Sequence, residues 1–192
     1  MKTALIVLDL INDIVDTDGK VGGTTIAVQA RSRGILGKAN TAMEIARRNG
    51  WPVVVVKVGF SSRYQEQPKH SPFFGKAHEF KALELEQWGT EFHPELRVDP
   101  SDFVVTKSRV NAFYNTPLES LLRAQGIERV VLLGVSTTWA VEAATRDAHD
   151  RDYRVVVVED ACAAHDEPQH QASIRHLSAI AEITTTAQLE NI

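Results

Sequence analysis

Cysteine is almost absent from this sequence, which contains one, Cys162, among its 192 residues. A single cysteine excludes a disulfide within the chain and a zinc site built from several cysteines. An excess of positive charge is also lacking, because 21 lysines and arginines face 25 aspartates and glutamates, which leaves a net charge of −4. Phosphate backbones require a basic surface, so we expect no nucleic-acid partner.

Long hydrophobic runs are missing as well. The first apolar stretch, Ala4–Leu8, spans only five residues before the acidic residues Asp9 and Asp13. Such a stretch is too short and too acidic for a signal peptide or a membrane span, so we expect a cytoplasmic protein without a membrane partner. The length, with 43% hydrophobic and 24% charged residues, is typical of one globular domain covering residues 1–192.

Short β-branched runs alternate along the chain with stretches typical of helices. The expected strands are Ala4–Leu8, Val53–Val58, Phe103–Thr106, Val130–Leu133, Val155–Val158 and Ile180–Thr184. The expected helices are Ala39–Asn49, Leu118–Gln125, Thr138–Asp150 and Pro168–Leu177. Apolar runs that do not alternate indicate strands covered on both faces. The order predicts a three-layer α/β domain with about six mostly parallel strands and helices on both faces.

Residues 59–100 do not fit this alternation. The segment mixes proline, histidine and aromatic residues without a helical or strand period. About forty such residues inside one domain are typical of a functional lid or an insert. Its aromatic and cationic side chains could close over an aromatic or carboxylate-bearing ligand. These side chains are Arg63, Tyr64, Lys69, His70, Phe73, Phe74, Lys76 and Trp88.

Polar residues at the carboxyl ends of the expected strands are the candidates for chemistry, because open parallel sheets bind ligands there. Asp9 follows the first strand and Lys107 follows Phe103–Thr106, so the two can form an ion pair. Gly134–Thr138 joins a strand to a helix, where backbone amides can hold an anion or an oxyanion. Each feature also has an ordinary interpretation: an aspartate that caps a loop, a solvated lysine and a connecting turn without chemistry.

These pieces, taken in order, resemble the isochorismatase-like (cysteine hydrolase) family. The matching segments are Ala4–Asp13, Thr106-Lys107, Asn111–Phe113, Thr116–Leu118, Gly134–Thr138, Thr145–Ala148 and Glu159–Ala163. The resemblance implies a six-stranded Rossmann-like sheet and a homo-oligomer, whose subunit contacts are an alternative role for residues 59–100. It also implies a catalytic triad in which an aspartate takes the proton of a cysteine thiol and a lysine favours the thiolate.

The resemblance places the triad aspartate at Asp9 and the lysine at Lys107, but the cysteine position falls on Ala140. The substrate would then contact the residues around this position, namely Phe113, Val135, Ser136, Thr137 and Trp139. Alanine has no nucleophile, so covalent catalysis at that position is excluded.

Three explanations of Ala140 stay open. The chain can be a natural hydrolase without the cysteine, like family members that cleave vinyl ethers, with Asp9 protonating the enol carbon and water completing the reaction. It can instead be a cysteine amidohydrolase that carries a Cys-to-Ala substitution, or a non-catalytic binder of a small molecule. Our leading expectation is a hydrolase of a small metabolite.

Metal ligands are missing where the resemblance would put them. Relatives that deamidate nicotinamide hold a divalent ion with Asp-x-His after the second strand, and this chain has Lys57–Phe60 there. We therefore expect no metal and no other cofactor. Cys162 has no adjacent basic residue, so we expect a buried, unreactive thiol. The late histidines lack the i,i+4 spacing of a helical metal site and are expected at the surface or as caps: His149, His165, His170 and His176.

Overall fold

A parallel sheet forms the centre of the protein in the computed structural model, which describes all residues, 1–192. The strand order is β3-β2-β1-β4-β5-β6, and every neighbouring pair is parallel. The strands are β1 (Thr3–Leu8), β2 (Val53–Val58), β3 (Phe103–Lys107), β4 (Arg129–Val135), β5 (Arg154–Ala163) and β6 (Glu182–Thr184). This Rossmann-like order confirms the predicted α/β fold with six strands.

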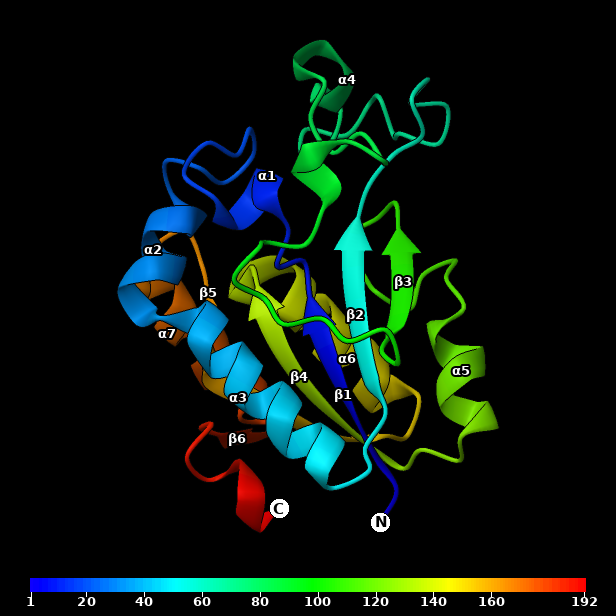
Figure 1. Ribbon diagram of the computed structural model, residues 1–192, viewed down its shortest axis with the longest axis vertical. Coiled ribbons are helices and arrows are strands. Elements are labelled where there is room, and N and C mark those ends of the chain that lie inside the picture. The colour runs from blue at the N-terminus through cyan, green and yellow to red at the C-terminus, as the bar shows by residue number, and fades with distance from the viewer.

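Helices cover both faces of the sheet, as Figure 1 shows for α3 in front of the strands and α6 behind them. The helices are α1 (Asn12–Val15), α2 (Ile26–Arg33), α3 (Ile35–Arg48), α4 (Ala77–Phe80), α5 (Leu118–Ala124), α6 (Glu142–Asp150) and α7 (Glu167–Leu177). Three single-turn helices complete the chain: the 3₁₀-helices η1 (Trp88–Thr90) and η3 (Leu189–Asn191), and the wider π-helix η2 (Thr137–Val141). Because β1 lies between other strands and between two helical layers, all six of its residues are buried. None of the helices is long and apolar enough to span a bilayer.

The close approach of β1 and β4 requires glycine at position 134. Gly134 pairs with Leu8 in the register of these strands and adopts a φ of +121°. A Cβ atom at this position would lie 2.1 Å from the carbonyl oxygen of Leu8, so only glycine fits without moving the backbone. The chain can therefore end β4 directly beside the residue that follows β1, which is Asp9.

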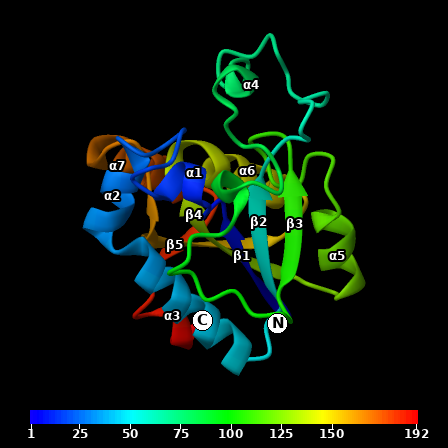
Figure 2. The same ribbon diagram turned by 45° about the horizontal axis from the view of Figure 1, so that its top comes forward.

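Most of the segment 59–100 projects beyond the carboxyl ends of the strands, with α4 in its outer part (Figures 1 and 2). Its last residues return along the sheet past α3, where Asn40 forms hydrogen bonds with Glu95 and Arg97. This segment has an aromatic core of its own, because the ring of Phe60 lies 6.0 Å from that of Tyr64 and 5.5 Å from that of Phe74. Phe60 also bridges to Glu84 in a short parallel pairing. The segment is thus a packed cap over one end of the sheet rather than a loose loop.

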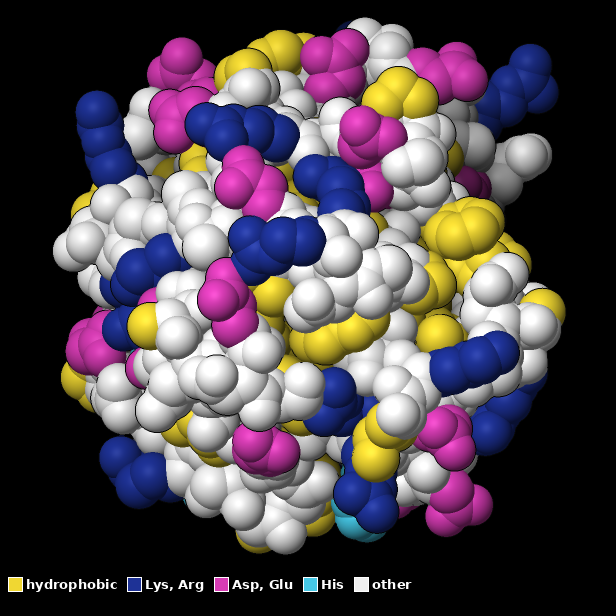
Figure 3. Space-filling model, turned by 60° about the horizontal axis from the view of Figure 1, so that its bottom comes forward, with side chains coloured by type: hydrophobic (Ala, Val, Ile, Leu, Met, Phe, Trp, Pro, Cys, Tyr) yellow, Lys and Arg dark blue, Asp and Glu magenta, His cyan; other side chains and the backbone are white.

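Both chain termini lie at the other end of the sheet, away from the projecting segment (Figures 1 and 2). Figure 3 brings this end forward and shows Lys and Arg side chains interspersed with Asp and Glu. No continuous basic patch appears on the face in that view.

Candidate active site

Asp9 and Lys107 meet at the carboxyl end of the sheet, in the ion pair expected from their sequence positions. The Nζ atom of Lys107 lies 2.7 Å from Oδ2 of Asp9 and also donates a hydrogen bond of 2.7 Å to the carbonyl oxygen of Val110. The two side chains are 1% and 4% exposed, so water screens this pair very little. Asp9 has a φ of 56°, a left-handed conformation that aspartate tolerates better than most residues.

The second carboxylate oxygen of Asp9 is free for chemistry. Oδ1 is buried and has no hydrogen-bond partner, whereas Oδ2 is held by Lys107. Burial raises the pKa of Asp9, and the ammonium group of Lys107 opposes this effect in part. A carboxyl group with a raised pKa and an unpartnered oxygen is suited to proton transfer.

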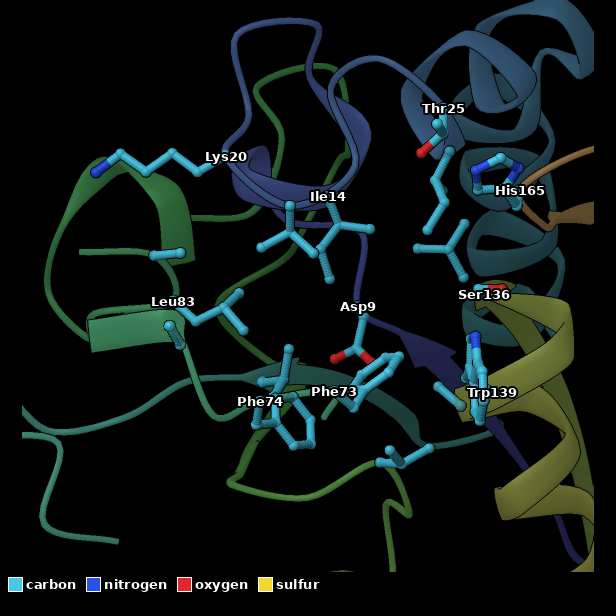
Figure 4. Close-up of a pocket in the computed structure, with 18 of the residues that line it drawn as sticks. Asp9, Ile14, Lys20, Thr25, Phe73, Phe74, Leu83, Ser136, Trp139 and His165 are labelled. Atoms are coloured by element: carbon cyan, nitrogen blue, oxygen red, sulfur yellow. The ribbon is translucent and has the colours of Figure 1, made fainter. Parts of the chain in front are cut away.

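A cavity of about 360 Å³ opens above this ion pair. In Figure 4, Phe74 and Leu83 lie on one side of Asp9 and Ser136 and Trp139 on the other, and the ring of Phe73 overlaps Asp9 in the view. Most of the wall is apolar, and its hydrophobic members are Ile14, Val21, Ile26, Val58, Phe73, Phe74, Ala77, Phe80, Ala82, Leu83, Val110, Val135, Trp139 and Ala140. Lys20 belongs to the lining, but its ammonium group points away and bonds to the carbonyl oxygen of Lys81 at 2.9 Å. The cavity therefore offers a hydrophobic environment around one ion pair.

Two aromatic side chains meet at the opening of the cavity. The ring of Phe73, from the projecting segment, lies 5.0 Å from that of Trp139, from the turn after β4. Each side chain is about half exposed, at 51%. Because they come from different parts of the chain, their contact joins the segment 59–100 to the sheet edge and narrows the entrance.

The turn η2 carries Ala140 into the cavity wall. The amides of Trp139 and Val141 donate to the carbonyl oxygen of Ser136, and this wide turn leads directly into α6. Ala140 is 3% exposed and lines the cavity together with Asp9 and Lys107. The position to which the resemblance assigns a nucleophile therefore lies at the site, and its methyl group cannot attack a substrate.

Four of the five predicted substrate contacts come from this turn and strand end, and three of them line the cavity: Val135, Ser136 and Trp139. Thr137 does not line it, because its fully buried side chain points to His170 of α7 at 2.9 Å. Phe113 is also outside, where its ring stacks on Tyr153 at 6.3 Å. Thr137 and Phe113 therefore lie outside the lining of this cavity, and their role as substrate contacts stays a prediction.

The projecting segment supplies part of the cavity, but not all of its predicted residues do so. Phe73, Phe74 and Lys76 line the cavity, together with Phe80 and Leu83, which the sequence analysis did not single out. The other predicted members lie outside the lining, and they are Arg63, Tyr64, Lys69, His70 and Trp88. Ile14 lies in α1 and Ile26 begins α2, and both were missed because the sequence did not predict these two helices.

Cys162 lies away from the cavity and is fully buried. Its thiol donates to the carbonyl oxygen of Val158 at 3.3 Å, and burial raises its pKa to about 12. The thiolate that would act as a nucleophile is therefore almost unpopulated at neutral pH. No three histidine, cysteine, aspartate or glutamate side chains gather in a cluster that could hold a metal ion.

Comparisons with known proteins give one consistent match. The isochorismatase domain model matches residues 3–188. The chain is 34% identical over 194 residues to an uncharacterised isochorismatase family protein, YecD, of Escherichia coli O157:H7, covering 98% of this chain and 95% of that protein. It is 30% identical to the N-carbamoylsarcosine amidase of Thermoplasma acidophilum, with a TM-score of 0.77 and 97% of each chain covered. A cysteine hydrolase of Pseudomonas syringae pv. phaseolicola 1448A, at 22% identity, shares the fold with a TM-score of 0.89 over 99% of this chain and 91% of that chain.

Proposed function

Because this chain belongs to the isochorismatase family, we propose that it is a hydrolase of a small metabolite that works without a cysteine nucleophile. In this proposal Asp9 is the proton donor and Lys107 is its counter-ion. The substrate is a vinyl ether or a related acid-labile compound. A cytoplasmic location, a homo-oligomeric state and a lid role for residues 59–100 stay predictions.

One observation carries this proposal: the free carboxylate oxygen of Asp9 lies beside an apolar cavity whose wall has alanine at position 140. Burial raises the pKa of Asp9, which increases the fraction of the carboxyl group that holds a proton to donate. Lys107 then stabilises the carboxylate that remains after donation, through the 2.7 Å contact. Asp9 paired with Lys107 is therefore suited to hydrolysis that begins with protonation of the substrate, rather than to covalent catalysis.

Hydrolysis of a vinyl ether at this site would begin with proton transfer from Asp9. The Asp9 carboxyl group gives its proton to the terminal enol carbon, and the positive charge is shared between the other vinyl carbon and the ether oxygen. Water adds to that carbon, and the resulting hemiketal loses the alcohol to leave a carbonyl product. A proton released by the added water returns to Asp9.

The wall of the cavity favours a substrate with an apolar body. The rings of Phe73, Phe74 and Trp139 can enclose such a body, and the charge of Lys107 is balanced by Asp9. A compound carrying several anionic groups would lose hydration there without gaining a free cation deep in the site. This supports a substrate that is neutral or has one charged group placed at the opening, near Lys76 or His165.

The relationship to N-carbamoylsarcosine amidase makes an amide substrate the main alternative. Amide hydrolysis through an acyl-enzyme needs a nucleophile at the cavity, and Ala140 does not provide one. That alternative therefore requires a cysteine in place of alanine at position 140.

The test compares wild type, Asp9→Asn and Asp18→Asn on a panel of small vinyl ethers and small primary amides. Asp18 is an exposed aspartate outside the cavity and serves as the matched control. We expect turnover of a vinyl ether to fall by about 10²- to 10⁴-fold in Asp9→Asn and to stay unchanged in Asp18→Asn, which is the usual contribution of a general acid. In wild type, turnover should decrease as the pH rises through the pKa of Asp9, because the protonated form is the active one.

Undiminished turnover by Asp9→Asn would overturn the proposal, provided that melting curves show both variants folded. Binding of panel compounds without turnover by wild type would also overturn it and would identify the chain as a binding protein. Turnover of amides alone would contradict the assignment of Asp9 as the acid for an enol carbon.

A further inference from the structure

A second buried carboxylate, that of Asp13, lies in α1, four residues after Asp9. Asp13 is 1% exposed, and it does not line the cavity that contains Asp9. The ammonium group of the neighbouring Lys20 is bound by the carbonyl oxygen of Lys81 at 2.9 Å rather than by this carboxylate. The partners of the Asp13 side chain are backbone amides instead. The reaction steps give this carboxylate no role, although it is buried close to the site.

Both carboxylate oxygen atoms of Asp13 accept hydrogen bonds, from amides of two different segments. Oδ2 accepts from the amide of Leu83 at 2.6 Å, and Oδ1 accepts from the amide of Lys20 at 3.2 Å. A backbone N–H group can only donate, so both oxygen atoms must act as acceptors. The main-chain carbonyl oxygen of Asp13 also accepts from the amides of Val21 and Gly22, each at 2.9 Å. Asp13 thus joins the projecting segment 59–100 to the loop between α1 and α2.

A further part of the projecting segment, η1, packs directly on the carboxylate. Gly89 lies so close that a Cβ atom added there would be 2.3 Å from Oδ2 and 2.4 Å from Cγ of Asp13. Next to Asp13, the side-chain amide of Asn12 donates to the carbonyl oxygen of Trp88 at 2.8 Å. The carboxylate is therefore held between η1 and the two amides, with little room to rotate.

The two segments that Asp13 joins both contribute to one wall of the cavity. Leu83 comes from the projecting segment and Lys20 from the loop, and both residues line the cavity. Figure 4 shows Leu83 and Lys20 on the same side of Asp9, opposite Trp139. The position of this wall therefore depends on the contacts that Asp13 makes behind it.

A displacement of Leu83 would also reach the aromatic part of the wall. The carbonyl oxygen of Leu83 accepts from the amide of Phe60 at 2.8 Å. The ring of Phe60 in turn lies 5.5 Å from that of Phe74, which lines the cavity. The anchor at Asp13 is thus connected to the wall through packed, hydrogen-bonded neighbours.

We propose that Asp13 is a positioning residue for the cavity. Its carboxylate fixes the place of Leu83 relative to the loop that carries Lys20, and thereby limits the size of the ligand that the cavity admits. This role does not depend on which reaction the cavity performs. It requires two acceptor oxygen atoms. Asparagine has the same shape but only one such atom, so its NH₂ group would face one of the two amides, donor against donor.

The first measurement follows the two amides directly in ¹H–¹⁵N spectra of ¹⁵N-labelled protein. We expect the amide proton of Leu83 to resonate far downfield in wild type, because its hydrogen bond is short and its acceptor is charged. Asp13→Asn should shift the amide protons of Leu83 and Lys20 upfield, since one loses its acceptor and the other loses the charge of its acceptor. Unchanged resonances would show that the carboxylate does not hold these amides and would overturn the proposal.

The second measurement tests the size limit, in a parent that carries Ala140→Cys. The introduced thiol lies in the cavity wall, and its alkylation is timed with the small reagent iodoacetamide and with the bulky reagent N-phenylmaleimide. Asp13→Asn should raise the rate of the bulky reagent relative to the small one by about tenfold, because a hydrogen bond to a charged group holds the wall in place. Asp18→Asn, which changes an exposed aspartate of the same loop, is the matched control and should keep the ratio of the parent.

Gly89→Ala tests the same contact without changing the chemistry of the carboxylate. Its Cβ would displace the carboxylate from the two amides, and Gly89 itself does not line the cavity. We expect the same upfield shifts and the same rise in the ratio of rates, and this variant decides the question if Asp13→Asn does not fold.

One pattern of results separates positioning from simple stabilisation. If Asp13→Asn and Gly89→Ala lower the melting temperature and shift the two amide resonances but leave the ratio of rates at the value of the parent, Asp13 stabilises the fold without setting the wall, and the proposal is wrong. None of these measurements uses turnover, so their failure is distinct from a failure of the proposed hydrolase activity.

Discussion

Ala140→Cys gives the most direct test of how the catalytic positions are assigned. The substitution adds one sulfur atom at a position that lines the same cavity as Asp9 and Lys107. The natural thiol of Cys162 provides an internal reference, because burial raises its pKa to about 12. A cavity thiol with an ordinary pKa is about one quarter ionised near pH 8, against about one part in ten thousand for a pKa of about 12.

The higher thiolate fraction alone would make alkylation at residue 140 faster than at Cys162 by about three and a half powers of ten. The thiolate of Cys162, however, is more basic and therefore intrinsically more nucleophilic. With a Brønsted slope near 0.45 this correction removes about one and a half powers of ten, which leaves alkylation about 50- to 100-fold faster at residue 140. The ammonium group of Lys107 would increase the ratio further. Iodoacetamide labelling followed by peptide mass spectrometry measures both sites in one sample, and Ala140→Ser controls for the change of shape. Equal rates at residues 140 and 162 would refute the placement of the nucleophile position.

Gly134→Ala should lower the free energy of unfolding by about 3 kcal/mol or more, because the added Cβ would meet the carbonyl oxygen of Leu8. Urea unfolding measures this change, and a loss below about 1 kcal/mol would contradict the close approach of the two strands. Phe73→Ala should widen the entrance and change KM by several-fold with little effect on the melting temperature, since Phe73 is half exposed; an unchanged KM would show that its contact with Trp139 does not affect binding. Incubation with EDTA should leave the melting temperature and any turnover unchanged, and an activity that zinc restores after EDTA treatment would contradict this.

The strands could be predicted because their signal is local, whereas the Rossmann-like strand order was an implication of the family resemblance. Ala4–Leu8 and Val53–Val58 are uninterrupted apolar runs, as central strands covered by helices require, and the observed strands match them within one residue. β5 is longer than expected, since it continues from Val158 through polar Glu159 and Asp160 to Ala163. The helix α2 was missed because Ile26–Arg33 has only two buried residues and no clear apolar face.

The side-chain directions that the sequence did not predict depend on distant elements. Thr137 faces away from the cavity because α7, thirty-three residues later, brings His170 to it. His170 itself could have been recognised as buried, since His170, Ser173 and Leu177 recur at the spacing of one helix face and are the buried residues of α7. Phe113 belongs to a matching segment, but likeness to a family does not state which way a ring points, and Tyr153 takes its face.

The ends of the chain lie opposite the cavity, and this arrangement has a practical use. Both termini are at the amino-end side of the sheet, while the entrance between Phe73 and Trp139 is at the carboxyl-end side (Figures 1 and 4). A purification tag, a biotin or a fused fluorescent protein at either end would therefore extend away from the entrance. The protein can be tethered to a sensor surface by one terminus with its opening directed into the flowing solution, which allows ligand libraries to be screened without first knowing the substrate.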